Sequence, residues 1–178
     1  RRLAAPALAA YLAAMEPARR ARLQQIAALF AADMPLNLDA WDGYPAERER
    51  FYDMLKGAAA RPLVLSGDSH SAWVNELHDA AGRRVAIESG ATAVTSPESG
   101  YGSWIPGMDL KPVIVAQNAE VLHLDTDKGF TLLTLQTDRA TADLIAVATI
   151  DSRSPDSRVT GSYHVRPEAG GVSAVESD

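Results

Sequence analysis

The chain has 178 residues, of which 47% are hydrophobic and 22% charged, with a net charge of −6 and no cysteine. This length suits one globular domain or a piece of a larger one, and the negative charge argues against a general nucleic-acid binder, which needs clustered Lys and Arg for phosphate contacts. The absence of cysteine excludes disulfides, thiolate nucleophiles and zinc–thiolate sites, and no apolar run approaches the ~20 residues of a membrane span.

Helices are predicted for the N-terminal part of the chain. Segments 7–15 and 18–32 are rich in Ala, Leu, Arg and Gln, which favour helices, and Pro17 separates the two segments. The sequence begins with Arg1 rather than Met, so we expect a processed or truncated chain whose natural start is missing.

A further helix is predicted to begin at Pro45. The residues before it, 33–45, include the Pro, Asn, Asp and Gly that are typical of an irregular connection. Proline is favoured at the first position of a helix, and the acidic Glu47 in the first turn interacts favourably with the helix dipole. Apolar residues at helical spacing predict a buried stripe formed by Phe51, Met54, Leu55 and Ala58.

Strands are predicted from residue 62 onward. "PLVLSG" (62–67) is a short apolar run before a turn signal, which indicates a strand buried on both faces. "AWVNELHD" (72–79) and "RVAIESG" (84–90) are typical of two strands joined by the turn "AAGR" (80–83). Residues 90–107 are interrupted by Gly and Pro, so we expect mainly loop there.

The last third of the chain also has the pattern of strands. Residues 120–151 predict a three-stranded meander with turns at "DTDKG" (125–129) and "TDRAT" (137–141). One more strand is predicted at "GSYHVR" (161–166), and residues 167–178 are expected to form a flexible tail. The fold class is therefore α/β, with N-terminal helices followed by a mostly antiparallel sheet.

The sharpest candidate for chemistry is the pair Asp68 and His70 in "VLSGDSHSAW" (64–73). On extended backbone two residues that are two apart point roughly the same way, and the end of a strand frees both side chains to reach one ion. A carboxylate and an imidazole suit zinc, manganese or iron. The alternative is a tight turn in which Asp68 caps backbone N–H groups and His70 lies on the surface, and the spacing alone leaves both interpretations open.

The order of several motifs distinguishes between these interpretations. "WDGYPAERERF" (41–51) is followed by "LVLSGDSHSAWVNEL" (63–77), "SGATAVTSP" (89–97) and "GFTLLTLQTDRATADL" (129–144). This ordered set, within residues 35–150, closely resembles the C-terminal half of the PhoD-like alkaline phosphatases of the metallophosphoesterase superfamily. No single motif is as specific as the set.

The resemblance implies a four-layer α/β/β/α fold that holds two or three metal ions, including iron and calcium, at the ends of strands. Members of the family hydrolyse phosphate monoesters and diesters with a metal-bound hydroxide, and they are commonly periplasmic or secreted. The family's "GDxH" step falls on Gly67 to His70, so the resemblance assigns metal-ligand roles to Asp68 and His70. Residues 1–34 would then form a helical insertion or cap, and residues 35–166 the C-terminal half of the phosphatase domain.

The chain also departs from the family pattern. The family often has an aliphatic residue at the position of Ser69. The superfamily's upstream ligand steps, including a "GNHD"-like step, are absent, and Gly67–Asp68 is the only Gly–Asp pair in the sequence. We therefore expect this chain to need a missing N-terminal portion of the same protein and to be inactive alone. Half of a layered fold exposes a face of its sheet, so an oligomer is possible.

An alternative function belongs to another class of protein. The chain could be a non-catalytic α/β domain that binds a partner, with a vestigial Asp–His step. The upstream sequence of the parent gene would distinguish the two, because only a phosphatase would carry the remaining ligand steps.

Other residues are weaker candidates. Trp41, Asp42 and Tyr44 form an aromatic–acidic cluster that could face substrate, although rings at a loop–helix junction usually pack. Asn75 could orient the His70 loop by a hydrogen bond or could face solvent. Thr95 and Ser96 could line the pocket, or they could belong to an ordinary turn.

Overall fold

The computed structural model describes the following residues: 16–18, 20–21, 38–57, 62–96, 111, 114–115, 118–153, 156–169 and 171–177. They divide into two compact units, Arg1–Met54 and Leu55–Asp178. The helices predicted over 7–15 and 18–32, and the boundary predicted at residue 34, lie almost entirely outside the described residues.

The helix predicted to begin at Pro45 is confirmed as α3 (Pro45–Gly57), and the 3₁₀ helix η1 (Trp41–Gly43) precedes it. The predicted apolar stripe is only partly correct. Tyr52 is the buried residue of α3, at 6% exposure, whereas Met54 is 66% exposed. Phe51 stacks on Trp41, with ring centroids 5.6 Å apart, so an aromatic pair replaces part of the expected stripe.

The first sheet has the strand order β1-β3-β2-β4. Its strands are β1 (Leu63–Ser66), β2 (Ala72–His78), β3 (Arg84–Gly90) and β4 (Val121–Asp125). The predicted hairpin is confirmed, because β2 and β3 are antiparallel neighbours. The prediction that β1 is buried on both faces is wrong: among the described residues β1 pairs only with β3, in parallel, and Leu65 is 64% exposed. A short apolar run cannot distinguish an edge strand from a central one.

The second sheet has the order β10-β7-β6-β5. Its strands are β5 (Gly129–Leu135), β6 (Ala140–Val147), β7 (Ser157–Val165) and β10 (Glu176–Ser177). The predicted meander is therefore wrong in one respect: β4 belongs to the first sheet, and residues 126–128 carry the chain across to the second. The alternation of side chains identifies strands but does not say which sheet they join.

The C-terminal segment forms strands where a flexible tail was expected. Strands β8 (Pro167–Glu168) and β9 (Gly171–Val172) pair with each other, and β10 pairs with β7. His164 Nε2 lies 2.9 Å from a carboxylate oxygen of Glu176, which attaches β10 to its neighbour. Strands of two residues are too short to show the alternation of apolar and polar residues that predicts a strand.

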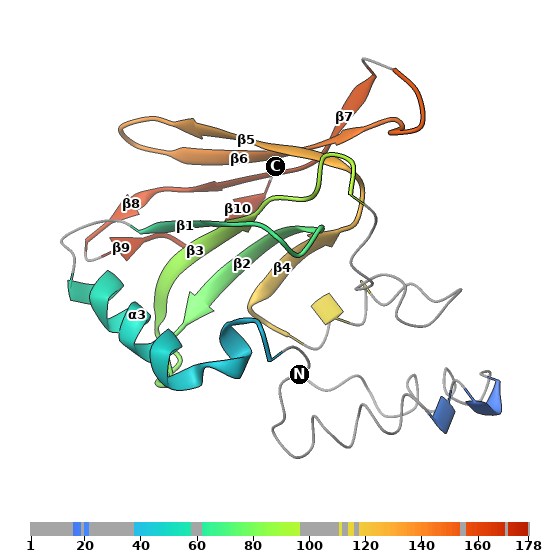
Figure 1. Ribbon diagram of the computed structural model, residues 1–178. Coiled ribbons are helices and arrows are strands. Elements are labelled where there is room, and N and C mark those ends of the chain that lie inside the picture. The colour runs from blue at the N-terminus through green and yellow to red at the C-terminus, as the bar shows by residue number, and fades with distance from the viewer. Residues whose placement is uncertain are drawn as a thin grey trace. The chain divides into compact units, whose positions relative to one another are not determined.

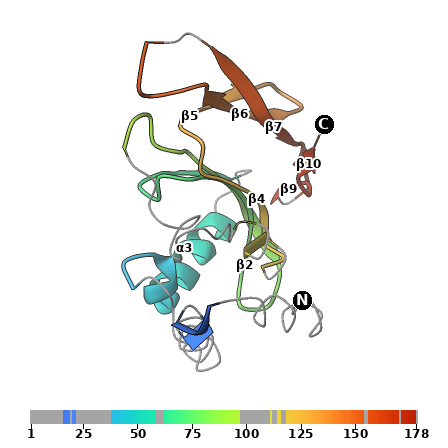
Figure 2. The same cartoon turned by 90° about the vertical axis from the view of Figure 1, so that its right-hand side faces the viewer.

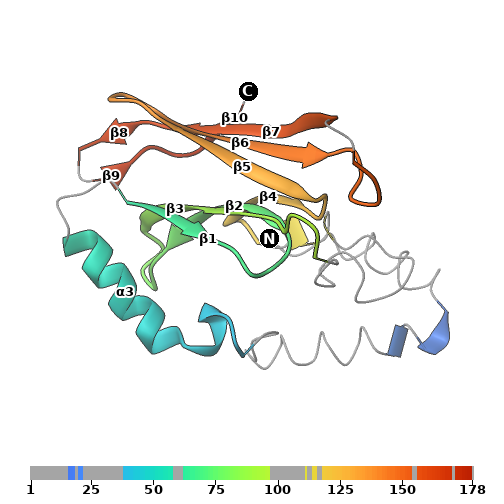
Figure 3. The same cartoon turned by 45° about the horizontal axis from the view of Figure 1, so that its top comes forward.

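The two sheets of the second unit lie face to face, as Figures 1 and 3 show, and Figure 2 shows the same two layers from the side. The core between them includes a cluster of Ala72, Val74 and Leu144, with Tyr163 and Val175 packed against it. Alternate residues of β6 turn inward, and Leu144 is only 1% exposed.

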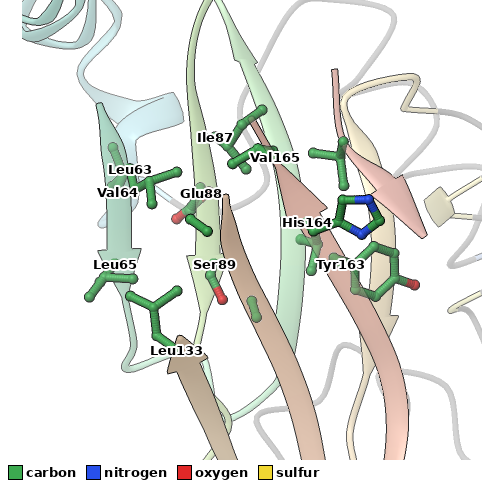
Figure 4. Close-up of a pocket in the computed structure, with 14 residues that line it drawn as sticks. Leu63, Val64, Leu65, Ile87, Glu88, Ser89, Leu133, Tyr163, His164 and Val165 are labelled. Atoms are coloured by element: carbon green, nitrogen blue, oxygen red, sulfur yellow. The ribbon is translucent and has the colours of Figure 1, made fainter. Parts of the chain in front are cut away.

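A small apolar pocket of about 30 Å³ remains between the sheets (Figure 4). Its lining includes Leu63, Leu65, Ile87, Leu133, Tyr163 and Val165. This volume is sufficient for a water molecule but not for a substrate. Because neither Asp68 nor His70 lines it, we assign this pocket to core packing.

The turn between β2 and β3 is organised by Asp79, which is 6% exposed. Its Oδ1 atom accepts hydrogen bonds from the backbone N–H groups of Ala81 and Arg83, each at 3.0 Å. Its Oδ2 atom contacts the Arg83 guanidinium at 2.9 Å and Lys56 Nζ at 3.1 Å. The pKa of Asp79 is held well below its ordinary value of 3.8, although burial opposes the shift. The largest cause is the hydrogen bond from the Arg83 backbone N–H, and the Arg83 and Lys56 side chains add smaller contributions.

We predict that Asp79→Asn lowers the stability of the chain at neutral pH and that its effect depends on pH. A carboxyl group with a lowered pKa in the folded state stabilises the fold above its unfolded pKa, and this contribution is lost as the pH falls. The difference in urea midpoint between wild type and Asp79→Asn should be constant between pH 7 and 5 and should shrink toward pH 3. Asp138→Asn, in an exposed turn, is the control. A pH-independent difference would contradict the prediction.

Candidate functional site

The residues between β1 and β2 have unusual backbone conformations. Asp68 has φ 65° and His70 has φ 55°, and these are the only described residues other than glycine with positive φ. The pair therefore does not lie on the extended backbone that the sequence predicted. Non-glycine residues in this region cost on the order of 1–3 kcal/mol each and are concentrated at functional sites.

Asp68 is the central residue of a very tight turn. The Ser69 N–H donates to the Gly67 carbonyl at 2.7 Å, and with φ 65° at the residue between them this is the rare, strained type of γ-turn. The Asp68 side chain is exposed and His70 is half-buried. The turn thus directs the carboxylate toward solvent at the end of β1.

Ser69 supports this loop, which explains why a polar residue fits the position. Trp73 Nε1 donates to Ser69 Oγ at 2.9 Å, and Ser69 Oγ donates to the Ser71 carbonyl at 3.3 Å. An aliphatic side chain could not make these two contacts. The loop ends at Ser71, which is fully buried.

The site lies where parallel strands end. Because β1 and β3 run in parallel, with Ser66 opposite Gly90, the segments that follow them leave the same edge of the sheet. Ligand sites in open α/β sheets commonly form outside the carboxyl ends of strands. From the segment after β3, Thr92 Oγ1 lies 3.2 Å from the His70 carbonyl, and from the β4–β5 connection Lys128 Nζ donates to the same carbonyl at 3.2 Å.

Sequence reasoning missed Thr92 and Lys128. They are 22 and 58 residues from His70, and no local pattern marks such distant contacts. Only the sheet pairing brings the three segments together.

The pair Asp68 and His70 supplies few donors. Within the part of the chain that the structure describes, no three His, Asp or Glu side chains gather as a metal site would require. Two carboxylates near this edge have other partners: Asp125, the last residue of β4, lies 3.6 Å from Lys111, and Asp127 of the β4–β5 connection forms an ion pair with Arg158. The loop can therefore contribute two ligands to a centre completed by other residues.

The other predicted site residues have different surroundings. Asn75 Nδ2 donates to Glu88 Oε2 at 2.8 Å, across the β2–β3 pair. This hydrogen bond stabilises the sheet and does not orient the His70 loop. Thr95 and Ser96 are exposed in the segment after β3, which leaves the same edge as the Asp68 loop.

The aromatic–acidic cluster belongs to the first unit. Trp41 and Tyr44 are each 53% exposed. Asp42 accepts a hydrogen bond from Arg48 at 2.6 Å. The turn before α3 requires glycine at position 43, because a Cβ atom there would lie 2.1 Å from the Leu38 carbonyl oxygen. The cluster therefore has a fixed local geometry.

Comparison with known proteins identifies the family. The family model described as PhoD-like phosphatase matches residues 7–144 of the chain. The chain belongs to the PhoD-like phosphatase family. The resemblance inferred from the motifs is thereby confirmed.

Two relatives show how much of the family's length the chain represents. It is 44% identical over 43 residues to alkaline phosphatase D of Bacillus subtilis (strain 168), a match that covers 24% of the chain and 7% of that protein. A solved structure of PhoD matches with a TM-score of 0.61 and 24% identity, covering 76% of the chain and 26% of PhoD. The chain therefore shares the mixed α/β, mostly stranded fold of part of PhoD. Among the described helices, none has the length and apolar character of a membrane span.

We predict that this PhoD-like phosphatase chain tolerates glycine better than alanine at position 68. Glycine relieves the left-handed strain, whereas alanine keeps it and also removes the carboxylate. Asp68→Gly should have a free energy of unfolding about 1 kcal/mol higher than Asp68→Ala, as measured by urea denaturation. Ala80→Gly, in the β2–β3 turn, is the control. Because φ of Ala80 is not positive, glycine relieves no strain there and should lower the stability. Equal stability of the two Asp68 variants would contradict the assigned backbone conformation.

Proposed function

We propose that this chain is the C-terminal part of a metal-dependent phosphoesterase that hydrolyses phosphate monoesters or diesters. The observation that carries the proposal is the left-handed Asp68–His70 pair at the carboxyl edge of the sheet, in a chain of the PhoD-like phosphatase family. Backbone strain is concentrated at functional sites, and two strained residues in one short loop are consistent with a loop that presents two ligand side chains to one site.

The donor chemistry of the loop fits a metal centre. An aspartate carboxylate and an imidazole nitrogen are suitable ligands for iron, manganese or zinc, and the carboxylate alone would also suit calcium. The family resemblance favours iron and calcium. When bound, such ions lower the pKa of water and neutralise charge on phosphoryl oxygens.

Residues of this chain would have distinct tasks at that centre. Asp68 and His70 would hold metal, and the Ser69 contact with Trp73 would fix the loop between them. Thr95 and Ser96, exposed beyond the same edge, would face the substrate. The Asn75 side chain, which donates a hydrogen bond to Glu88, would stabilise the sheet beside the loop and would not orient His70.

The remaining ligands would come from outside this chain. The match covers 26% of PhoD, which leaves most of that protein's length to supply them. We propose that the complete protein forms the four-layer α/β/β/α sandwich and that, as in the family generally, it is periplasmic or secreted.

We predict that Asp68→Asn and His70→Ala lower the metal content of the full-length protein. Each variant removes one ligand, and activity toward a colorimetric phosphomonoester should fall by more than about 100-fold, beyond the loss expected for an outer contact. Metal content is measured by elemental analysis, with Asp138→Asn as a matched carboxylate control. Unchanged metal content in both variants would remove the pair from the site and would favour the non-catalytic interpretation.

The 178-residue chain alone is predicted to lack phosphoesterase activity, because only two candidate ligands lie together among its described residues. The measurement is turnover of the same substrate by the isolated chain, with iron and calcium added, against the full-length protein. Robust metal-dependent turnover by the isolated chain would show that its own residues complete the site.

A further inference from the structure

The backbone carbonyl of His70 is contacted by two side chains from distant segments. Thr92 Oγ1 lies 3.2 Å from it, and Lys128 Nζ donates to it at 3.2 Å. Thr92 Oγ1 also lies 2.9 Å from the Asp127 carbonyl, and Lys128 Nζ also donates to the Thr126 carbonyl at 3.3 Å. Together the two side chains connect the Asp68–His70 loop to the β4–β5 connection.

Thr92 and Lys128 are themselves attached to the sheets. The Ala91 N–H donates to the Ser66 carbonyl at 2.9 Å, at the end of β1. The Val147 N–H donates to the Lys128 carbonyl at 2.8 Å, from the end of β6. The Gly129 N–H donates to the Ala93 carbonyl at 3.2 Å, which joins the two supporting segments directly. These backbone hydrogen bonds therefore attach the segments that carry Thr92 and Lys128, and through them the His70 carbonyl, to the ends of strands in both sheets.

We propose that Thr92 and Lys128 are positioning residues that hold His70 in its left-handed conformation and so aim the imidazole at the metal site. The inference rests on the proposed function. Fixing the carbonyl fixes the peptide plane that follows His70 and so restricts rotation of the His70 backbone, which would otherwise relax toward negative φ. A lysine ammonium has three N–H donors and no acceptor, so it can bind several carbonyls at once, as Lys128 does here.

The contacts are directed at the candidate ligand itself. Lys128 donates to the His70 carbonyl, and the Thr92 hydroxyl shares its single proton between that carbonyl and the Asp127 carbonyl. Neither side chain is needed for the ladder hydrogen bonds of β1, β2 or β3, which are made by backbone groups. Partners that orient a metal ligand affect metal affinity, whereas a contact that only adds stability does not. This difference makes the role testable.

The experiment compares Thr92→Val, Thr92→Ser and Lys128→Met in the full-length protein. Valine keeps the shape of threonine but removes the hydroxyl, and methionine keeps most of the lysine stem but removes the ammonium. Thr131→Val is the matched control, because the Thr131 hydroxyl is buried and has no hydrogen-bond partner among the described residues. Two quantities are measured: hydrogen exchange of the backbone amides of residues 68–71 without metal, and the affinity for Mn²⁺ alone, followed by the EPR signal of free Mn²⁺.

Thr92→Val and Lys128→Met should each accelerate exchange in residues 68–71 and weaken Mn²⁺ binding by about tenfold. Thr92→Ser should restore both quantities, and Thr131→Val should change neither. Unchanged exchange would overturn the positioning role, and so would faster exchange with unchanged Mn²⁺ affinity.

The exchange measurement also separates this inference from the proposed function. If Asp68→Asn and His70→Ala bind Mn²⁺ as wild type does, the ligand assignment fails, and the positioning role fails with it. If these two variants lose Mn²⁺ while Thr92→Val and Lys128→Met behave as wild type, the positioning role alone is wrong.

Discussion

The packing of Leu144 against Ala72 and Val74 joins the two sheets, and the placement of the candidate site depends on it. Full burial of a leucine side chain stabilises a fold by roughly 1.5–3 kcal/mol, and Leu144 is 1% exposed. Ala72 is also the first residue of β2 and directly follows the Asp68–His70 loop. The same contact that closes the core therefore fixes the point at which the loop ends.

The strain in this loop is opposed by contacts from several segments of the chain. Two left-handed residues cost on the order of 1–3 kcal/mol each, whereas one hydrogen bond adds a net ~0.5–1.5 kcal/mol. A single contact would not be enough to hold the conformation. The Trp73–Ser69 bond, the Lys128 bond to the His70 carbonyl and the Thr92 hydroxyl, which shares its proton between the His70 and Asp127 carbonyls, oppose this cost together.

Local patterns predicted the elements whose causes are local. Pro45 begins α3 because proline suits the first helical position, and β2 and β3 form a hairpin whose turn includes Gly82 at φ 73°. The motif around Asp68 and His70 was found because its residues are adjacent in sequence. The family could be recognised for the same reason, since its motifs are short and ordered.

What the sequence did not predict depends on pairing between distant segments. The pattern of β4 is that of an ordinary strand, and its place in the first sheet is decided by its register with β2. The exposure of Leu65 depends on β1 being at an edge, among the strands described. The left-handed φ at His70 is likewise a tertiary effect, because histidine alone favours negative φ and the supporting groups lie 22 and 58 residues away.

A ligand loop that is already ordered before metal binds lowers the entropic cost of forming a metal site from two parts of a protein. Ordering a flexible ligand costs conformational entropy at the moment of binding, and a preformed loop avoids that cost. Two donors are nevertheless too few, because zinc takes about four ligands and calcium about six to eight. Asp68 is exposed, so its carboxylate is largely hydrated until other groups surround it. In the proposed metal centre, this loop would contribute geometry, and the residues that complete the coordination shell would contribute most of the binding energy.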